Sequence, residues 1–155
     1  MNKTNAMRRL DAAKIPYEIK EYAVDENDLS GTHIAEQIGL PFAQVFKTLV
    51  AKGDKTGMLV FCIPVDKEID LRHAASLTGN KKIEMLPVKD LLATTGYIRG
   101  GCSPIGMKKK FPTYLDESAR NFEKITVSAG IRGAQLLLRV DHLADFIEAK
   151  ICQIV

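Results

Sequence analysis

The residues best suited to chemistry form one glycine-rich turn and the basic run after it, Gly100-Gly101-Cys102-Ser103-Pro104-Ile105-Gly106 and Lys108-Lys109-Lys110. Glycine adopts positive φ without steric cost and lets a ligand approach the main chain closely. Proline sets the turn and lacks a competing N–H donor. Uncovered amides beside three cationic side chains would attract an anion, or a carbonyl oxygen that becomes negative during a reaction. The turn is therefore a candidate site.

Two more cationic side chains could act beside this turn. Lys47 stands in the apolar segment 45–50, and strand alternation puts it on the same face as Val45 and Leu49. Such a lysine is either an edge residue that extends into water or a cation on a pocket wall. Arg132 lies between Gly130 and Gly133 in a second glycine turn, from which it could reach a phosphate.

Three residues near the glycine turns are candidate nucleophiles. Ser103 and Ser128 adjoin the turns, but the Gly-x-Ser-x-Gly pattern of hydrolases is absent, which favours turn and hydrogen-bonding roles. Cys102 could act at an electropositive turn, although no motif links it to a histidine. Asp116 and Tyr22 are compatible with a pocket rim.

Composition limits the class of protein. A chain of 155 residues with 46% hydrophobic residues is long enough for one domain with one core, spanning 1–155. No segment is apolar enough for a membrane helix or a signal peptide, so we expect a cytoplasmic protein. Three dispersed cysteines and three isolated histidines predict neither disulfides nor a metal site. The net charge of +3 is too small to indicate a nucleic-acid binder, and the basic clusters are either solvated surface or phosphate contacts beside a pocket.

The pattern of apolar residues predicts short helices mixed with short strands. Helices are expected at 5–14, 33–40, 70–77, 88–94, 118–122 and 141–149, and strands at 17–24, 45–51, 57–65, 82–85, 113–116, 125–128 and 135–140. Residues 53–57 predict an antiparallel hairpin between two of the strands. Without regular alternation of strand and helix, this order favours a mixed α/β domain over a doubly wound sheet. We expect one mostly antiparallel sheet flanked by short helices.

The ordered set of motifs resembles the YbaK/EbsC family. The matching segments are Val45-x-Lys47-Thr48-Leu49, Gly100-Gly101-x-Ser103-Pro104-x-Gly106, Lys108-Lys109, Pro112-Thr113, Asp116 and Val127-Ser128-Ala129-Gly130-x-Arg132-Gly133. The resemblance covers essentially the whole chain. It implies a deacylase that acts in trans on Cys-tRNA(Pro) or Cys-tRNA(Cys), with a fold similar to the editing domain of bacterial prolyl-tRNA synthetase.

The resemblance also implies roles for individual residues. Lys47 and Gly101 match the catalytic positions, and Lys108, Lys109 and Lys110 would contact tRNA phosphates. Substrate-binding roles are implied for Tyr22, Gly100, Ser103, Pro104, Gly106, Asp116, Ser128, Gly130 and Arg132. The substrate's own thiol is expected to attack its ester, which requires no cofactor and leaves Cys102 a bystander. Gln135 departs from the acidic residue that some members carry.

Three alternatives remain open from the sequence. The chain could be an Ala-tRNA(Pro) deacylase of the same superfamily, in which water is the nucleophile. It could be a non-catalytic module that binds the tRNA 3′ end or a synthetase. For a deacylase, the resemblance implies prolyl-tRNA synthetase as the partner that selects the tRNA. It could also be a hydrolase that depends on Cys102.

Overall fold

The predicted hairpin is the centre of the fold. In a computed structural model that describes residues 1–155, β2 (Phe46–Gly53) and β3 (Gly57–Pro64) pair antiparallel along their whole length. Gly57 has φ +78°, which the tight connection requires and glycine adopts freely. The hairpin prediction is confirmed.

The hairpin belongs to a five-stranded mixed sheet with the order β4-β2-β3-β5-β8. On one edge, β4 (Ile83–Met85) pairs antiparallel with β2 only over Ala51–Gly53. On the other side, β5 (Thr113–Asp116) and β8 (Lys150–Cys152) are added in parallel. The sequence did not predict β8, because three residues after a helix are too few to show a strand periodicity.

The remaining strands form a separate antiparallel sheet with the order β1-β7-β6. Its members are β1 (Glu18–Glu21), β6 (Lys124–Ser128) and β7 (Ala134–Arg139). An isolated parallel bridge between Val45 and Thr126 brings β6 beside the start of β2. The mixed α/β class and the predominance of antiparallel pairs are confirmed, but the strands are divided between two sheets rather than gathered in one.

Five helices surround the sheets, at α1 (Asn5–Ala12), α2 (Gly31–Ile38), α3 (Leu71–Thr78), α4 (Val88–Thr95) and α5 (Val140–Phe146). Their starts and ends follow local chemistry: the Asp70 side chain accepts from the His73 N–H, and Gly79 ends α3 in the left-handed conformation. Short 3-10 helices cover Phe42–Gln44 and Glu117–Asn121, the second replacing the expected helix at 118–122. None of the helices has the length and apolar character needed to cross a lipid bilayer.

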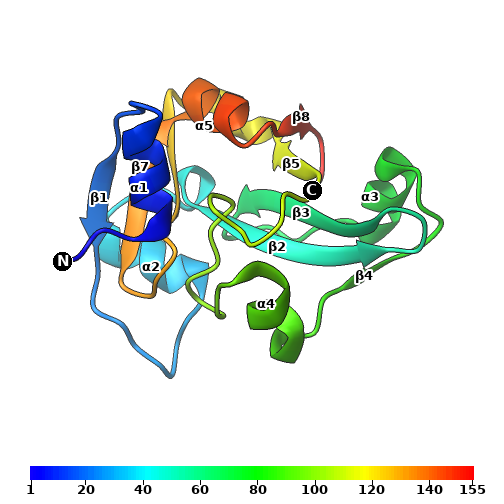
Figure 1. The fold of residues 1–155 in the computed structure, drawn as a ribbon, viewed down its shortest axis with the longest axis horizontal. Coiled ribbons are helices and arrows are strands. Elements are labelled where there is room, and N and C mark those ends of the chain that lie inside the picture. The colour runs from blue at the N-terminus through cyan, green and yellow to red at the C-terminus, as the bar shows by residue number, and fades with distance from the viewer.

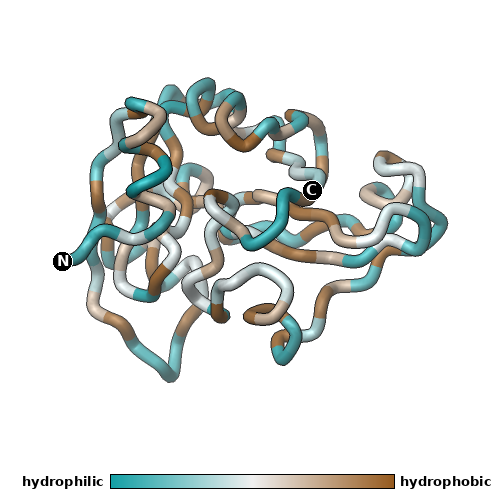
Figure 2. The backbone as a smooth tube through the Cα atoms, viewed as in Figure 1, coloured by the Kyte–Doolittle hydropathy of each residue, from teal (hydrophilic) through white to brown (hydrophobic).

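Two buried clusters lie on opposite faces of the large sheet. One contains Phe46 and Cys62 and joins this sheet to the small sheet, α1 and α5, whereas the other contains Phe61 and packs against α3. In Figure 1, β2 and β3 extend to the right with α4 below them and α5 above. Figure 2 shows that these two strands are rich in hydrophobic residues, while the hairpin tip is hydrophilic. α4 contributes no residue to the fully buried members of either cluster.

Asp116, at the end of β5, connects the chain end to the core. Its carboxyl group accepts from the N–H groups of Ile154 at 2.9 Å and Ser118 at 3.1 Å, and the residue is 2% exposed. Asp116 therefore has a structural role: its carboxylate supplies the acceptors that these buried backbone N–H groups need.

We expect Asp116→Ala to lower the free energy of unfolding by about 2–3 kcal/mol, since buried N–H groups lose their acceptor. Urea unfolding followed by circular dichroism would measure this. Asp66→Ala, at an exposed position without a side-chain partner, is the matched control and should change stability little. Equal stability of the two variants would contradict the structural role.

Candidate functional site

A cavity of about 420 Å³ opens beside the edge of β2, where the two sheets diverge. Because β4 pairs with β2 only from Ala51 onward, the edge over Lys47–Val50 has no strand of the large sheet beside it. Twelve of the twenty lining residues are hydrophobic, which suits a small, largely apolar ligand group. The lining residues come from several segments that are distant in sequence: 29–31, 34, 45–50, 65, 85, 86, 88, 91, 99, 100, 102, 128 and 135.

Lys47 lies on the wall of this cavity. It is half-buried on β2, opposite Ile63 of β3, and makes neither an ion pair nor a side-chain hydrogen bond. The lining contains no aspartate, glutamate or histidine, so no acid there can neutralise the Lys47 ammonium. An unpaired cation in a mostly apolar pocket attracts a carbonyl or phosphate oxygen.

The first glycine turn forms another part of the cavity wall through Arg99, Gly100 and Cys102. The backbone N–H groups of Gly100 and Cys102 donate to no protein acceptor, whereas the Gly101 N–H donates to the Ile98 carbonyl at 3.0 Å. At the cavity wall, Gly100 and Cys102 thus retain free amide donors, whereas the neighbouring Gly101 does not.

Gly101 instead permits close packing of the two glycine turns. A Cβ at position 101 would lie 3.0 Å from the Ile131 carbonyl carbon and 3.1 Å from the Arg132 nitrogen. Arg132 strengthens this contact, because its Nε donates to the Arg99 carbonyl at 2.8 Å. Gly130, at φ +97°, faces the Tyr97 ring, which leaves no room for a side chain. The second turn therefore supports the first.

Of the other predicted substrate-binding residues, only Ser128 lines the cavity. Ser103 is fully buried and its Oγ accepts from the Ile105 N–H at 3.2 Å, which stabilises the turn from within. The Tyr22 N–H donates to the Gly133 carbonyl at 2.9 Å, so Tyr22 lies beside the second turn but outside the lining. Asp116 lies at another depression, next to Ser118 and Gln153.

Pro104 and Gly106 lie at a second cleft, also of about 420 Å³. Lys108, Lys109 and Lys110 line it together with Arg9 of α1. Lys110 forms an ion pair with Glu148, whereas Lys108, Lys109 and Arg9 have no acidic partner. The basic run thus forms one wall of a cationic cleft. The start of the first glycine turn lines the cavity, and its end, Pro104–Gly106, lines this cleft.

The comparisons with known proteins agree on one family. Residues 30–146 match the aminoacyl-tRNA editing domain family. The Enterococcus faecalis (strain ATCC 700802 / V583) protein named "Putative Cys-tRNA(Pro)/Cys-tRNA(Cys) deacylase EbsC" is 51% identical over 98% of this chain and 93% of its own length. The chain belongs to the aminoacyl-tRNA editing domain family.

A more distant relative and a solved structure are also similar to this chain. A segment of the proline–tRNA ligase of Fervidobacterium nodosum (strain ATCC 35602 / DSM 5306 / Rt17-B1), 21% of that enzyme, is 24% identical to 76% of this chain. A crystal structure of "a putative trans-editing enzyme for prolyl tRNA synthetase" shares the fold, with a TM-score of 0.82 at 21% identity, and covers 99% of this chain and 98% of its own. The part of the chain that matches the editing domain family contains every cavity-lining residue except Leu29.

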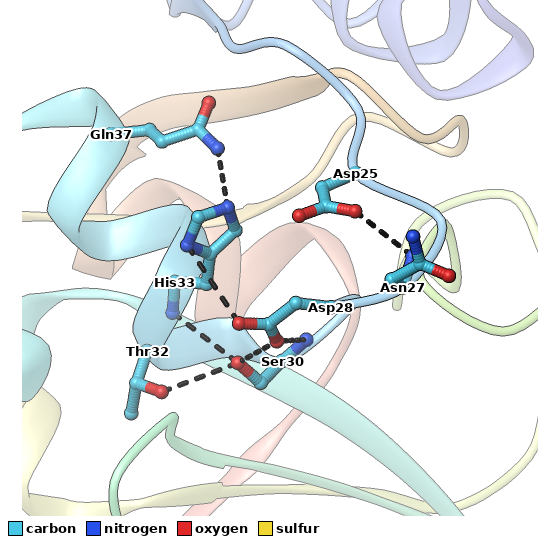
Figure 3. A network of polar contacts seen from close by, with 7 residues as sticks. All are labelled: Asp25, Asn27, Asp28, Ser30, Thr32, His33 and Gln37. Atoms are coloured by element: carbon cyan, nitrogen blue, oxygen red, sulfur yellow. Dashed lines mark hydrogen bonds and ion pairs between the residues drawn. The ribbon is translucent and has the colours of Figure 1, made fainter.

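Within this editing domain, a polar network holds the start of α2 at the cavity (Figure 3). The Ser30 hydroxyl donates to Asp28 at 2.6 Å, and His33 Nδ1 lies 3.8 Å from the other Asp28 oxygen. Hydrogen bonds from Ser30 lower the pKa of Asp28. Ser30 Oγ accepts the backbone N–H of His33 and also lies 3.4 Å from the Thr32 hydroxyl, and no hydrogen bond joins it to the His33 ring. The three residues therefore form a helix cap and not a catalytic triad.

Arg99 and Gln135 are polar residues of the cavity to which sequence reasoning gave no role. Arg99 stands just before the turn in an irregular segment without a motif. The usable signal for Gln135 was a single amide in the otherwise apolar segment 134–138. Alternation alone did not show that this face of β7 lines a cavity.

Burial makes Cys102 a poor nucleophile, because it raises the pKa of the thiol to about 11. At pH 7.5 we expect iodoacetamide to modify Cys102 on the order of 100-fold more slowly than the cysteine of an unstructured peptide, whose thiol has an ordinary pKa of about 8.5. Peptide mass spectrometry would measure the rate, which should rise steeply as the pH approaches 11. Modification at the rate of the free thiol would contradict this.

Proposed function

We propose that this editing domain is a deacylase that removes cysteine from mischarged tRNA(Pro) in trans, with Cys-tRNA(Cys) as a second substrate. The unpaired Lys47 ammonium on the wall of a mostly apolar cavity carries the proposal. The 51% identity to EbsC over nearly the whole chain supports the same substrate class. A second sieve of this kind is needed because a methylene-sized difference contributes only about 1–3 kcal/mol to amino-acid selection.

In this proposal, Lys47 and the glycine turn hold the ester carbonyl. The ammonium attracts the carbonyl oxygen, and the free N–H groups of Gly100 and Cys102 stabilise the negative charge that develops there. Gly101 acts through its missing side chain, which lets the two turns pack closely and fixes the direction of the amides. Ser128 borders the same cavity and contacts the aminoacyl group.

The nucleophile is the thiol of the bound cysteine. Its sulfur attacks the ester carbonyl carbon, the C–O bond to the tRNA ribose breaks, and the thiol proton passes through water to the released hydroxyl oxygen. The products are a cyclic thiolactone and uncharged tRNA. Intramolecular attack has a high effective molarity, so a cavity that only folds and orients the substrate suffices. The protonated Cys102 thiol takes no part.

The cationic cleft provides contacts to the tRNA backbone. Lys108, Lys109 and Arg9 are free to meet phosphates, whereas Glu148 already neutralises Lys110. Such contacts position the acceptor end without reading its sequence. Selection of tRNA(Pro) would then come from a partner, and the related segment within a proline–tRNA ligase favours prolyl-tRNA synthetase.

Deacylation of Cys-tRNA(Pro), Cys-tRNA(Cys) and Ala-tRNA(Pro) by the purified protein tests the function directly. Cleavage of the cysteinyl esters with release of a thiolactone is the expected result. Cleavage of Ala-tRNA(Pro) alone would indicate an alanine deacylase with water as nucleophile. Salt-sensitive binding without turnover would instead indicate a non-catalytic module.

We expect Lys47→Ala to reduce the deacylation rate of Cys-tRNA(Pro) by about 100-fold or more, the usual effect of removing an oxyanion donor. Rates under single-turnover conditions would measure this, with thermal unfolding to verify the fold. Lys52→Ala is the matched control, because Lys52 lies on the same strand but is exposed and outside the cavity. A Lys47→Ala enzyme with the wild-type rate would remove Lys47 from the mechanism.

Replacing both Lys108 and Lys109 by alanine should weaken binding of all uncharged tRNAs to a similar degree and reduce the salt dependence by roughly one per lost phosphate contact. Filter binding at several salt concentrations would measure both effects. The pair Lys81 and Lys82, a similar basic cluster outside the cleft, provides the control double variant. Equal loss in the two double variants would mean that only net charge matters.

A further inference from the structure

Gln135 is a buried amide on the cavity wall that the mechanism above does not use. It lies on β7, is 5% exposed and faces the cavity. Across the small sheet it is paired with Ser128 of β6. Directly paired residues on one face of a sheet have adjacent side chains, so these two residues form one polar patch in an otherwise mostly apolar lining.

The hydrogen bonds of Gln135 are only half complete. Its Oε1 accepts from the Thr126 hydroxyl at 3.2 Å, which fixes the orientation of the amide. Its Nε2 donates to no protein atom, yet it is not among the buried unpaired atoms and so remains open to the cavity. The Ser128 Oγ accepts from the Gly130 N–H at 3.1 Å, which leaves the hydroxyl proton free. The patch therefore presents donors.

No side chain of the lining accepts from these donors in the structure. The cavity contains no carboxylate, and its charged groups are the cations Lys47 and Arg99. A nearly buried donor without a partner is unfavourable, and a ligand that supplies an acceptor relieves that cost. Cysteine and serine carry a heteroatom on Cβ, whereas alanine and proline present only C–H groups to such a patch. A thiolate accepts more strongly than a thiol.

We propose that Gln135 determines the specificity of the cavity by donating an N–H to the sulfur or oxygen on Cβ of the bound amino acid. This inference rests on the proposed deacylase function and deepens it. The amide selects a thiol or hydroxyl side chain against alanine, and it stabilises the sulfur in the thiolate form that attacks the ester. Thr126 is a positioning residue, since it contacts the amide oxygen and not the donor.

Four proteins separate substrate recognition from structural support: wild type, Gln135→Met, Thr126→Val and the double variant. Rates of deacylation of Cys-tRNA(Pro), Ser-tRNA(Pro) and Ala-tRNA(Pro) would be measured for each, together with thermal unfolding. The double variant removes both hydrogen-bonding partners, so no buried polar group is left unpaired and stability should recover relative to Gln135→Met. Gln153→Leu, at an exposed position outside the cavity, is the surface control.

We expect Gln135→Met and the double variant to lose about tenfold or more of the preference for Cys-tRNA(Pro) over Ala-tRNA(Pro). Thr126→Val should keep most of that preference. A double variant with the wild-type ratio would overturn the role of Gln135 while leaving the deacylase function intact. A wild-type protein that cleaves none of the three esters would overturn the proposed function, and this inference with it.

Discussion

The contact between the two glycine turns is the constraint on which the site depends. Gly101 packs against the backbone of Ile131 and Arg132 so closely that a Cβ there would make contacts of 3.0–3.1 Å, and the backbone would have to shift to admit it. The contact joins a loop after α4 to the loop between β6 and β7, which are distant in sequence. Because the Arg132 Nε also donates to the Arg99 carbonyl, the second turn holds the main chain of the first turn at two neighbouring points. Free amides at Gly100 and Cys102 are useful only because this packing fixes their direction.

The division of the strands between two sheets creates the space for a ligand. A single continuous sheet would have placed a neighbour along the whole of β2. Instead β4 pairs with only three residues, and β6 approaches β2 only at its start. The resulting cavity combines an apolar wall, one unpaired lysine and donors from the main chain and Gln135, without any acid or histidine. This composition favours orienting a reactive substrate over supplying a nucleophile.

Much of the fold was predictable because its signals are local. The hairpin, all five helices and β5 followed from periodicity, capping residues and turn chemistry, as Asp70 and Gly79 at the ends of α3 illustrate. The mixed class followed from the order of elements. In contrast, β8 and the separation of the two sheets depend on which strands pair with each other. A single sequence carries no local pattern that identifies the pairing partners of a strand.

The sequence by itself determined the residue types of the site: a lysine in an apolar strand, two glycine turns, a basic run and the family they resemble. Only the tertiary structure decided which of them share a space. In the folded protein, Lys47, Gly100, Ser128 and Gln135 line one cavity, whereas the basic run lines a second cleft. Asp116 lies in neither of them and instead accepts a hydrogen bond from the backbone of Ile154 near the chain end. The physical reason is that backbone conformation follows from neighbouring residues, whereas a cavity is formed by packing between segments remote in the chain.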